Sequence, residues 1–169
     1  MHVGAHKGQE VEDYNSEFSN PKIHLFEPQK IPFEYLQSRY GSFENIRMYN
    51  FGLGSSNTSK KMYISNNDGQ SSSFLKPKEH LAVHPEIQFS EDSTQIEIKV
   101  FDDLNIANVE LLNIDTQGFE LEVLKGFHKS LVNDINYIIL EVNKKELYDG
   151  CPLVNDIDNY QSKYNFIII

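Results

Sequence analysis

The chain has 169 residues, a length that suits one domain with a single core. Its 15 lysine and arginine residues stand against 25 aspartate and glutamate residues, and the formal net charge of −10 disfavours binding to phosphate backbones and favours cationic ligands. The single cysteine, Cys151, excludes an internal disulfide, and the sequence has neither the roughly 18 apolar residues of a membrane span nor the apolar core of a signal peptide. We therefore expect residues 1–169 to form one cytoplasmic domain that binds neither nucleic acid nor a membrane.

Strands and helices are predicted to alternate over the first 51 residues. Short apolar runs predict strands, and apolar residues at helical spacing predict amphipathic helices. The predicted strands cover residues 1–3, 22–26 and 46–51, and the predicted helices cover residues 9–18 and 31–40. Such alternation is typical of a parallel sheet with helices packed against it.

The alternation lapses after residue 51. Residues 52–56 predict a loop, and residues 61–65 and 95–100 predict two antiparallel strands with one solvent-facing side, since Ile96 and Ile98 alternate with charged residues. The segment between these strands, residues 66–94, is longer than the roughly 12 to 15 residues of an ordinary loop. In a compact domain, such a segment is a lid, a binding loop or disordered.

The last third of the chain returns to alternation. Strands are predicted at residues 109–114, 136–142 and 166–169, and helices at residues 116–126 and 153–160. With right-handed crossovers, these elements predict an α/β fold, a Rossmann-like three-layer sandwich. Its sheet is expected to be mostly parallel, with an antiparallel insertion after the third strand.

A carboxylate follows the strand at residues 109–114. In open parallel sheets, ligands lie beyond the carboxyl ends of the strands, so Asp115 is a candidate for chemistry. It is also a favoured helix N-cap, because the next residues are predicted to be helical. Glu120 and Glu122 are interpreted as surface charges that match the helix dipole.

Two metal sites are weaker alternatives. Asp115, Glu141 and Asn143 offer oxygen ligands of the kind that magnesium prefers. His80 and His84 have the spacing of two zinc ligands on a helix, although Pro85 follows at once. We expect no metal.

The turns after the first two strands predict a nucleoside site. Gly4 and Gly8 allow close backbone approach, and Glu27 lies 19 residues after Gly8 (27 − 8 = 19), where a carboxylate accepts ribose hydroxyls. The three-glycine dinucleotide pattern is missing, which disfavours a pyrophosphate and nicotinamide-dependent oxidoreduction. S-adenosylmethionine, a nucleoside without phosphate and with a cationic sulfonium, fits better.

Six segments follow one another in a characteristic order, at residues 3–9, 25–28, 52–54, 71–73, 113–126 and 140–142, and include Val3-Gly4-Ala5-His6-Lys7-Gly8-Gln9, Leu25-Phe26-Glu27-Pro28 and Asn113-Ile114-Asp115-Thr116-Gln117-Gly118-Phe119-Glu120. Taken together, these segments resemble the FkbM-type S-adenosylmethionine-dependent methyltransferases. The resemblance implies methylation of a hydroxyl, often on a sugar or a polyketide-like small molecule.

The resemblance also implies roles for single residues. It places Gly4, Ala5 and Gly8 against the methionine part of the cofactor, Glu27 on the ribose, and Gly52 with Leu53 near adenine. The same segments add four further cofactor-binding candidates, His6, Gln9, Pro28 and Ser72.

The acceptor side of the site is assigned to two carboxylates. Asp115 orients the cofactor amino group or the acceptor, or accepts the acceptor's proton, and Glu141 is the second choice for that base. Holding the acceptor oxygen about 3 to 3.5 Å from the methyl carbon supplies most of the acceleration, and a base adds about 10² to 10⁴-fold.

Two departures from the family motivate an alternative. His2 stands where the family has an acidic residue, and the family leads us to expect a further antiparallel strand beside residues 166–169. Without that strand, an apolar edge would be open to self-association, and the oligomeric state is otherwise undetermined. The alternative function is a catalytically silent domain that binds S-adenosylmethionine or a partner.

Overall fold

A five-stranded parallel sheet forms the centre of the computed structural model, which describes residues 1–90 and 95–167. The strand order is β10-β9-β1-β2-β3, and every neighbouring pair is parallel. The strands are β1 (His2–Val3), β2 (Ile23–Phe26), β3 (Ile46–Tyr49), β9 (Leu111–Ile114) and β10 (Tyr137–Leu140). The predicted α/β fold with a mostly parallel sheet is confirmed.

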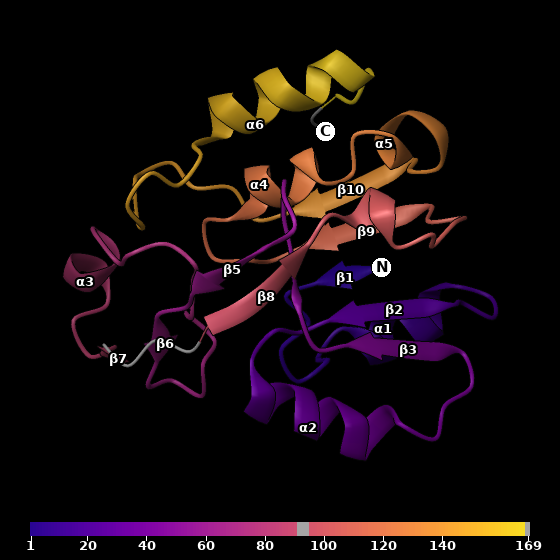
Figure 1. The fold of residues 1–169 in the computed structure, drawn as a ribbon, viewed down its shortest axis with the longest axis horizontal. Helices are drawn as coiled ribbons and strands as arrows, with labels where there is room; N and C mark the ends of the chain where they lie inside the picture. Colours follow the sequence, from indigo (N-terminus) through magenta and orange to yellow (C-terminus); the bar gives the residue numbers. More distant parts are fainter. Residues whose placement is uncertain (91–94, 168–169) are drawn as a thin grey trace.

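Helices cover both faces of this sheet (Figure 1). On one face lie α1 (Val11–Glu17) and α2 (Lys30–Tyr40), and on the other lie α4 (Glu120–Lys125), α5 (Ser130–Asn133) and α6 (Val154–Gln161). Each face has its own apolar core, because successive strand residues point to opposite sides. The short η1 (Phe101–Asp103) and η2 (Ser162–Tyr164) complete the second face.

The chain between β3 and β9 builds two smaller sheets. The first has the order β4-β8-β5, with β4 (Gly52–Leu53), β5 (Thr58–Lys61) and β8 (Gln95–Lys99), and the second pairs β6 (Ile64–Ser65) with β7 (Phe89–Ser90). A single-turn helix, α3 (His80–Val83), lies between β6 and β7 in the chain. The expected antiparallel insertion is confirmed by the pairing of β5 with β8.

Two predicted strands in this region are wrong in extent. The strand expected at residues 46–51 ends at Tyr49, and part of the expected loop at residues 52–56 is β4, which pairs with β8. The strand expected at residues 61–65 is divided between β5 and β6, which belong to different sheets. The chain leaves one sheet for the next at Met62, which belongs to neither strand and has a buried side chain.

The C-terminal strand predicted at residues 166–169 is absent where the structure can show it. Phe166 and Ile167 belong to no strand, and residues 168 and 169 lie outside the described part. Self-association through this edge therefore stays a prediction. Within residues 1–90 and 95–167, no helix has the length and apolar character needed to cross a bilayer.

Candidate functional site

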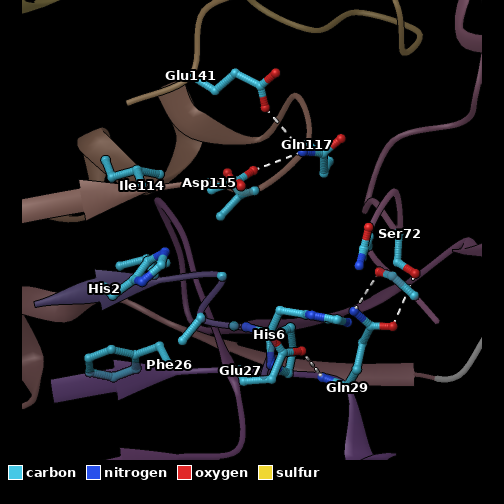
Figure 2. A pocket seen from close by; sticks show the side chains of 18 of the residues that line it. His2, His6, Phe26, Glu27, Gln29, Ser72, Ile114, Asp115, Gln117 and Glu141 are labelled. Carbon is cyan, nitrogen blue, oxygen red and sulfur yellow. Dashed lines mark hydrogen bonds between the residues drawn. The ribbon is translucent and has the colours of Figure 1, made fainter. Parts of the chain in front are cut away.

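The strand order reverses beside β1, because β2 and β3 follow on one side and β9 and β10 on the other. At such a switch point, the crevice beyond the carboxyl ends of the strands is where ligands bind. The residues after the strands therefore form a row, Glu141, Asp115, Gly4 and Glu27, and all four line one cavity of about 650 Å³. Figure 2 shows the two carboxylates Glu141 and Asp115 on one side of this cavity and Glu27 on the other.

The turn after β1 requires glycine because it packs closely against the turn that follows the neighbouring strand β9. Gly4 has φ +83°, and a Cβ at this position would lie 1.8 Å from the carbonyl oxygen of Asp115. The amides of Gly4 and Ala5 both donate to the carbonyl of Phe26, at 2.9 and 3.0 Å. Glycine at this position therefore allows the turn after β1 to pack against the backbone of Asp115. Gly4 also lines the cavity, where we expected it to allow close approach of a ligand.

Gly8 lies behind the turn and outside the cavity lining. Its φ is +72°, and a Cβ there would lie 2.8 Å from Leu36 and 2.9 Å from Tyr40 of α2. The Tyr40 hydroxyl donates to the Gly8 carbonyl at 3.0 Å. Gly8 therefore seats α2 against the turn, and this geometry does not support its predicted contact with the cofactor.

Glu27 is a buried carboxylate, 2% exposed, held at both oxygens. The amide of His6 donates to Oε2 at 2.8 Å, and the amide of Gln29 donates to Oε1 at 2.7 Å. Burial raises the pKa of Glu27 to about 7, although these two hydrogen bonds act in the opposite direction. Each oxygen retains a second lone pair, so the carboxylate can still accept two hydroxyl groups.

Residues 67–72 are hydrogen-bonded to the turns that follow β1 and β2. His6 Nε2 donates to the carbonyl of Asp68 at 2.8 Å, and the Gln29 side chain donates to the carbonyl of Gly69 at 3.0 Å. Ser72 Oγ donates back to Gln29 Oε1 at 3.0 Å. This part of the predicted irregular segment is therefore a covering loop that forms one wall of the cavity (Figure 2).

The turn after β9 is not helical. Gln117 and Gly118 have φ +53° and +97°, and α4 begins only at Glu120, with Phe119 at the N-cap. The prediction that Asp115 caps this helix is wrong, because it lies five residues before the first helical residue (120 − 115 = 5). Its side chain is therefore available to the cavity.

Glu120 holds this turn together from inside. It is 1% exposed, and its Oε1 accepts from the amide and hydroxyl of Thr116 and from the amide of Gly118, at 3.0 to 3.1 Å. Burial raises the pKa of Glu120. The prediction of a surface charge is wrong for Glu120, while Glu122 pairs at the surface with Lys125.

Replacing Glu120 with alanine is expected to lower the free energy of unfolding by about 2 kcal/mol or more, since two buried backbone amides lose their acceptor. Glu120→Gln is the matched control, because its amide oxygen can still accept all three hydrogen bonds. Urea denaturation of both variants measures the difference. Equal stability of Glu120→Ala and the wild type would show that the turn does not depend on this carboxyl.

Asp115 and Glu141 form a bridged carboxylate pair. Gln117 Nε2 donates to Asp115 Oδ1 at 2.8 Å and to Glu141 Oε2 at 3.1 Å (Figure 2). The Tyr148 hydroxyl lies 3.2 Å from Gln117 Oε1, which orients the amide with its nitrogen towards the carboxylates. Burial, followed by the charge of Asp115, raises the pKa of Glu141.

His2 closes the inner end of the cavity on the face covered by α1. His2 is 2% exposed, and burial lowers its pKa to about 4, so the imidazole is neutral. His2 Nδ1 lies 3.3 Å from the Tyr14 hydroxyl, which accepts from Asn113 at 2.6 Å. A neutral imidazole therefore stands where the resemblance led us to expect an acid.

The structure brings most of the predicted site residues together. The cavity lining contains eleven of them, namely Gly4, Ala5, His6, Gln9, Glu27, Pro28, Gly52, Leu53, Ser72, Asp115 and Glu141, and leaves out Gly8. Sequence reasoning missed Gln29, Gln117 and Tyr148. Gln29 was within reach, because a polar residue just before a predicted helix and beside Glu27 is a candidate contact, whereas Tyr148 has no local signal.

Neither metal alternative gains a ligand set. Asn143 is buried outside the cavity lining, and only Asp115 and Glu141 of that proposed trio face the cavity. His80 is in α3 and His84 follows it, with ring centroids 5.0 Å apart. Among the residues that the structure describes, no three His, Cys, Asp or Glu side chains are grouped to hold a metal ion.

Comparisons with known proteins agree with this fold. The family model described as the methyltransferase FkbM domain matches residues 2–168. The crystal structure of methyltransferase FkbM from Methylobacillus flagellatus KT is similar, with a TM-score of 0.60 and 16% sequence identity. That match covers 96% of this chain and 36% of the other, and at this identity it shows a shared fold. The search of curated proteins gave no match.

Proposed function

Because this chain belongs to the FkbM methyltransferase family, we propose that it methylates a hydroxyl of a glycan or small molecule with S-adenosylmethionine as the methyl donor. The observation that carries the proposal is the convergence of Gly4, Glu27 and Asp115, from three strands, on one cavity. The volume of about 650 Å³ lies within the roughly 300 to 1,000 Å³ usual for small-molecule sites.

The cavity has the chemical features that this cofactor needs. Glu27 offers two acceptor oxygens for ribose hydroxyls, and Phe51, Leu53, Met62 and Phe74 supply an apolar wall for adenine. The carboxylates in the lining favour a ligand with a net positive charge. The donor set therefore fits S-adenosylmethionine, with its ribose at β2 and its adenine towards β4.

The acceptor is assigned to the β9 and β10 side of the cavity. S-adenosylmethionine supplies an activated methyl group, so that the acceptor oxygen gains an O–C bond while the S–C bond breaks and its electron pair stays on sulfur. Asp115 takes the hydroxyl proton, and the hydrogen bond from Gln117 to its Oδ1 holds the side chain in the cavity lining. Glu141 is the second candidate for that base.

The covering loop at residues 67–72 shields the Glu27 side of the cavity from water. His6 and Gln29 fasten this loop to the turns that face the cofactor, so cofactor binding and loop closure act on the same residues.

A catalytically silent domain is the second candidate, and His2 is the observation that favours it. The test is incubation with S-adenosylmethionine carrying a labelled methyl group and a panel of sugars and polyhydroxylated small molecules. Label transfer to a hydroxyl supports the enzyme. Cofactor binding without transfer to any acceptor supports the silent domain, and binding of NAD in place of S-adenosylmethionine overturns both.

Cofactor binding is expected to tighten as the pH rises towards 7. Burial raises the pKa of Glu27 from 4.5 to about 7, so the free protein carries a proton there in mildly acidic solution. Accepting two ribose hydroxyls favours the ionised carboxylate, so binding releases this proton and the affinity falls about tenfold per pH unit below the pKa. The free energy of unfolding of the cofactor-free protein changes in the opposite direction to the cofactor affinity. It decreases from about pH 4.5 to 7, because the folded state binds the proton more tightly than the unfolded state does.

Calorimetry in buffers with different ionisation enthalpies, at about one pH unit on each side of the Glu27 pKa, measures the affinity and the released proton. Glu27→Gln has no titrating group at this position and serves as the control with a flatter profile. An equal wild-type affinity at the two pH values contradicts the ribose assignment.

A further inference from the structure

The charges that face the cavity are all of one sign. Its lining contains four acidic side chains, Glu10, Glu27, Asp115 and Glu141, and no lysine or arginine among the described residues. The other titratable groups that the structure describes in the lining are His2 and His6. Lys7, on the adjacent turn, pairs with Asp68 at 3.1 Å and is not part of the lining.

Two of these acids sit together on the acceptor side. β9 and β10 are paired in register at Ile114 and Leu140, so the next residues, Asp115 and Glu141, are neighbours at the sheet edge. Each gives one oxygen to the single Gln117 amide. Among the described residues, Gln117 alone donates an N–H hydrogen bond to these two side chains, and the two carboxyl groups are close enough to hydrogen-bond each other, which contributes to the raised pKa of Glu141.

Two carboxylates in one lining select a group that donates hydrogen bonds. A hydroxyl or an ammonium satisfies them, whereas a carboxylate or phosphate would add a third negative charge next to two others. Asp115 and Glu141 are solvent-exposed, so at separations of about 4 to 5 Å each such repulsion is worth on the order of tenfold in affinity after screening by water. The amide of Gln117 points its donors at the pair and leaves none for an anionic ligand.

We propose that the acceptor is an uncharged or cationic polyol, bound through a hydroxyl or ammonium group to the Asp115–Glu141 pair, and that anionic acceptors such as uronic acids and sugar phosphates are excluded. This inference rests on the proposed function, since it concerns the acceptor half of the same cavity. It deepens that function by giving the charge class of the substrate.

The test is a titration of ¹⁵N-labelled protein saturated with S-adenosylhomocysteine. The probes are three methyl glucosides that differ at carbon 6 alone, carrying an ammonium, a hydroxyl or a carboxylate. The side-chain amide resonances of Gln117 report binding at the pair. The ammonium form is expected to bind on the order of tenfold or more tightly than the carboxylate form, with the hydroxyl form between them.

The double variant Asp115→Asn with Glu141→Gln keeps the volume of both side chains and removes both charges. In this variant, the affinity ratio of the ammonium and carboxylate forms is expected to approach one. Equal or tighter wild-type binding of the carboxylate form overturns the inference, as does a Gln117 signal that none of the three sugars shifts. Failure of S-adenosylhomocysteine to shift the resonances of Gly4 and Glu27 is a separate result, which overturns the proposed function itself.

Discussion

Replacing Asp115 with asparagine is expected to lower kcat by about 10² to 10⁴-fold, the contribution of a positioned base to transfer from an unactivated hydroxyl. The asparagine oxygen can still accept the hydrogen bond that Gln117 donates at 2.8 Å, so the turn after β9 is expected to keep its shape. The affinity for S-adenosylmethionine should change much less than kcat. Steady-state kinetics with labelled cofactor measure the loss.

Glu141→Gln is the matched control, because it removes one charge from the same pair and keeps the contact with Gln117. A smaller loss in this variant identifies Asp115 as the base. A larger loss in Glu141→Gln than in Asp115→Asn transfers the role to Glu141. If both variants keep wild-type kcat, neither carboxylate accepts the proton, and positioning of the acceptor accounts for the rate.

Replacing Glu27 with alanine is expected to weaken S-adenosylmethionine binding on the order of 10²-fold or more, since two hydrogen bonds from ribose to a charged group are lost. The effect on folding stability is expected to be much smaller. The amides of His6 and Gln29 lose an acceptor, but Glu27 lines the cavity, so water can enter and accept their hydrogen bonds, whereas Glu120 lies outside the cavity lining.

Calorimetric titration and urea denaturation of the same preparation separate these two effects. Glu122→Ala removes a carboxylate from outside the cavity and controls for the change in net charge. Equal cofactor affinity in Glu27→Ala and the wild type would contradict the ribose assignment, whatever the stability of the variant.

The strand ends were the predictable part of the site. Apolar runs that stop at an acid place Glu27 and Asp115 at the carboxyl ends of parallel strands, and the sheet order then brings them together. That inference needs only local pattern and chain topology. It succeeds because few arrangements of β-α-β units are compatible with a single sheet.

The contacts that hold the site together could not be predicted, because they join residues that are far apart in the sequence. Tyr148 meets Gln117 across 31 residues of sequence, and Gln29 meets Ser72 across 43, so neither pairing has a local signal. Glu120 looks like a surface charge by its helical position and is buried because the preceding turn folds back onto it. Gly4 was singled out correctly for its turn, but the constraint is the carbonyl of Asp115.

The most direct test of the proposed cofactor site is a crystal structure of the protein with S-adenosylhomocysteine. We expect the ribose hydroxyls on Glu27, the adenine against Leu53 and Phe74, and the sulfur on the side of the cavity where Asp115 and Glu141 lie. A ligand bound elsewhere, or one in this cavity with its ribose away from Glu27, would contradict it.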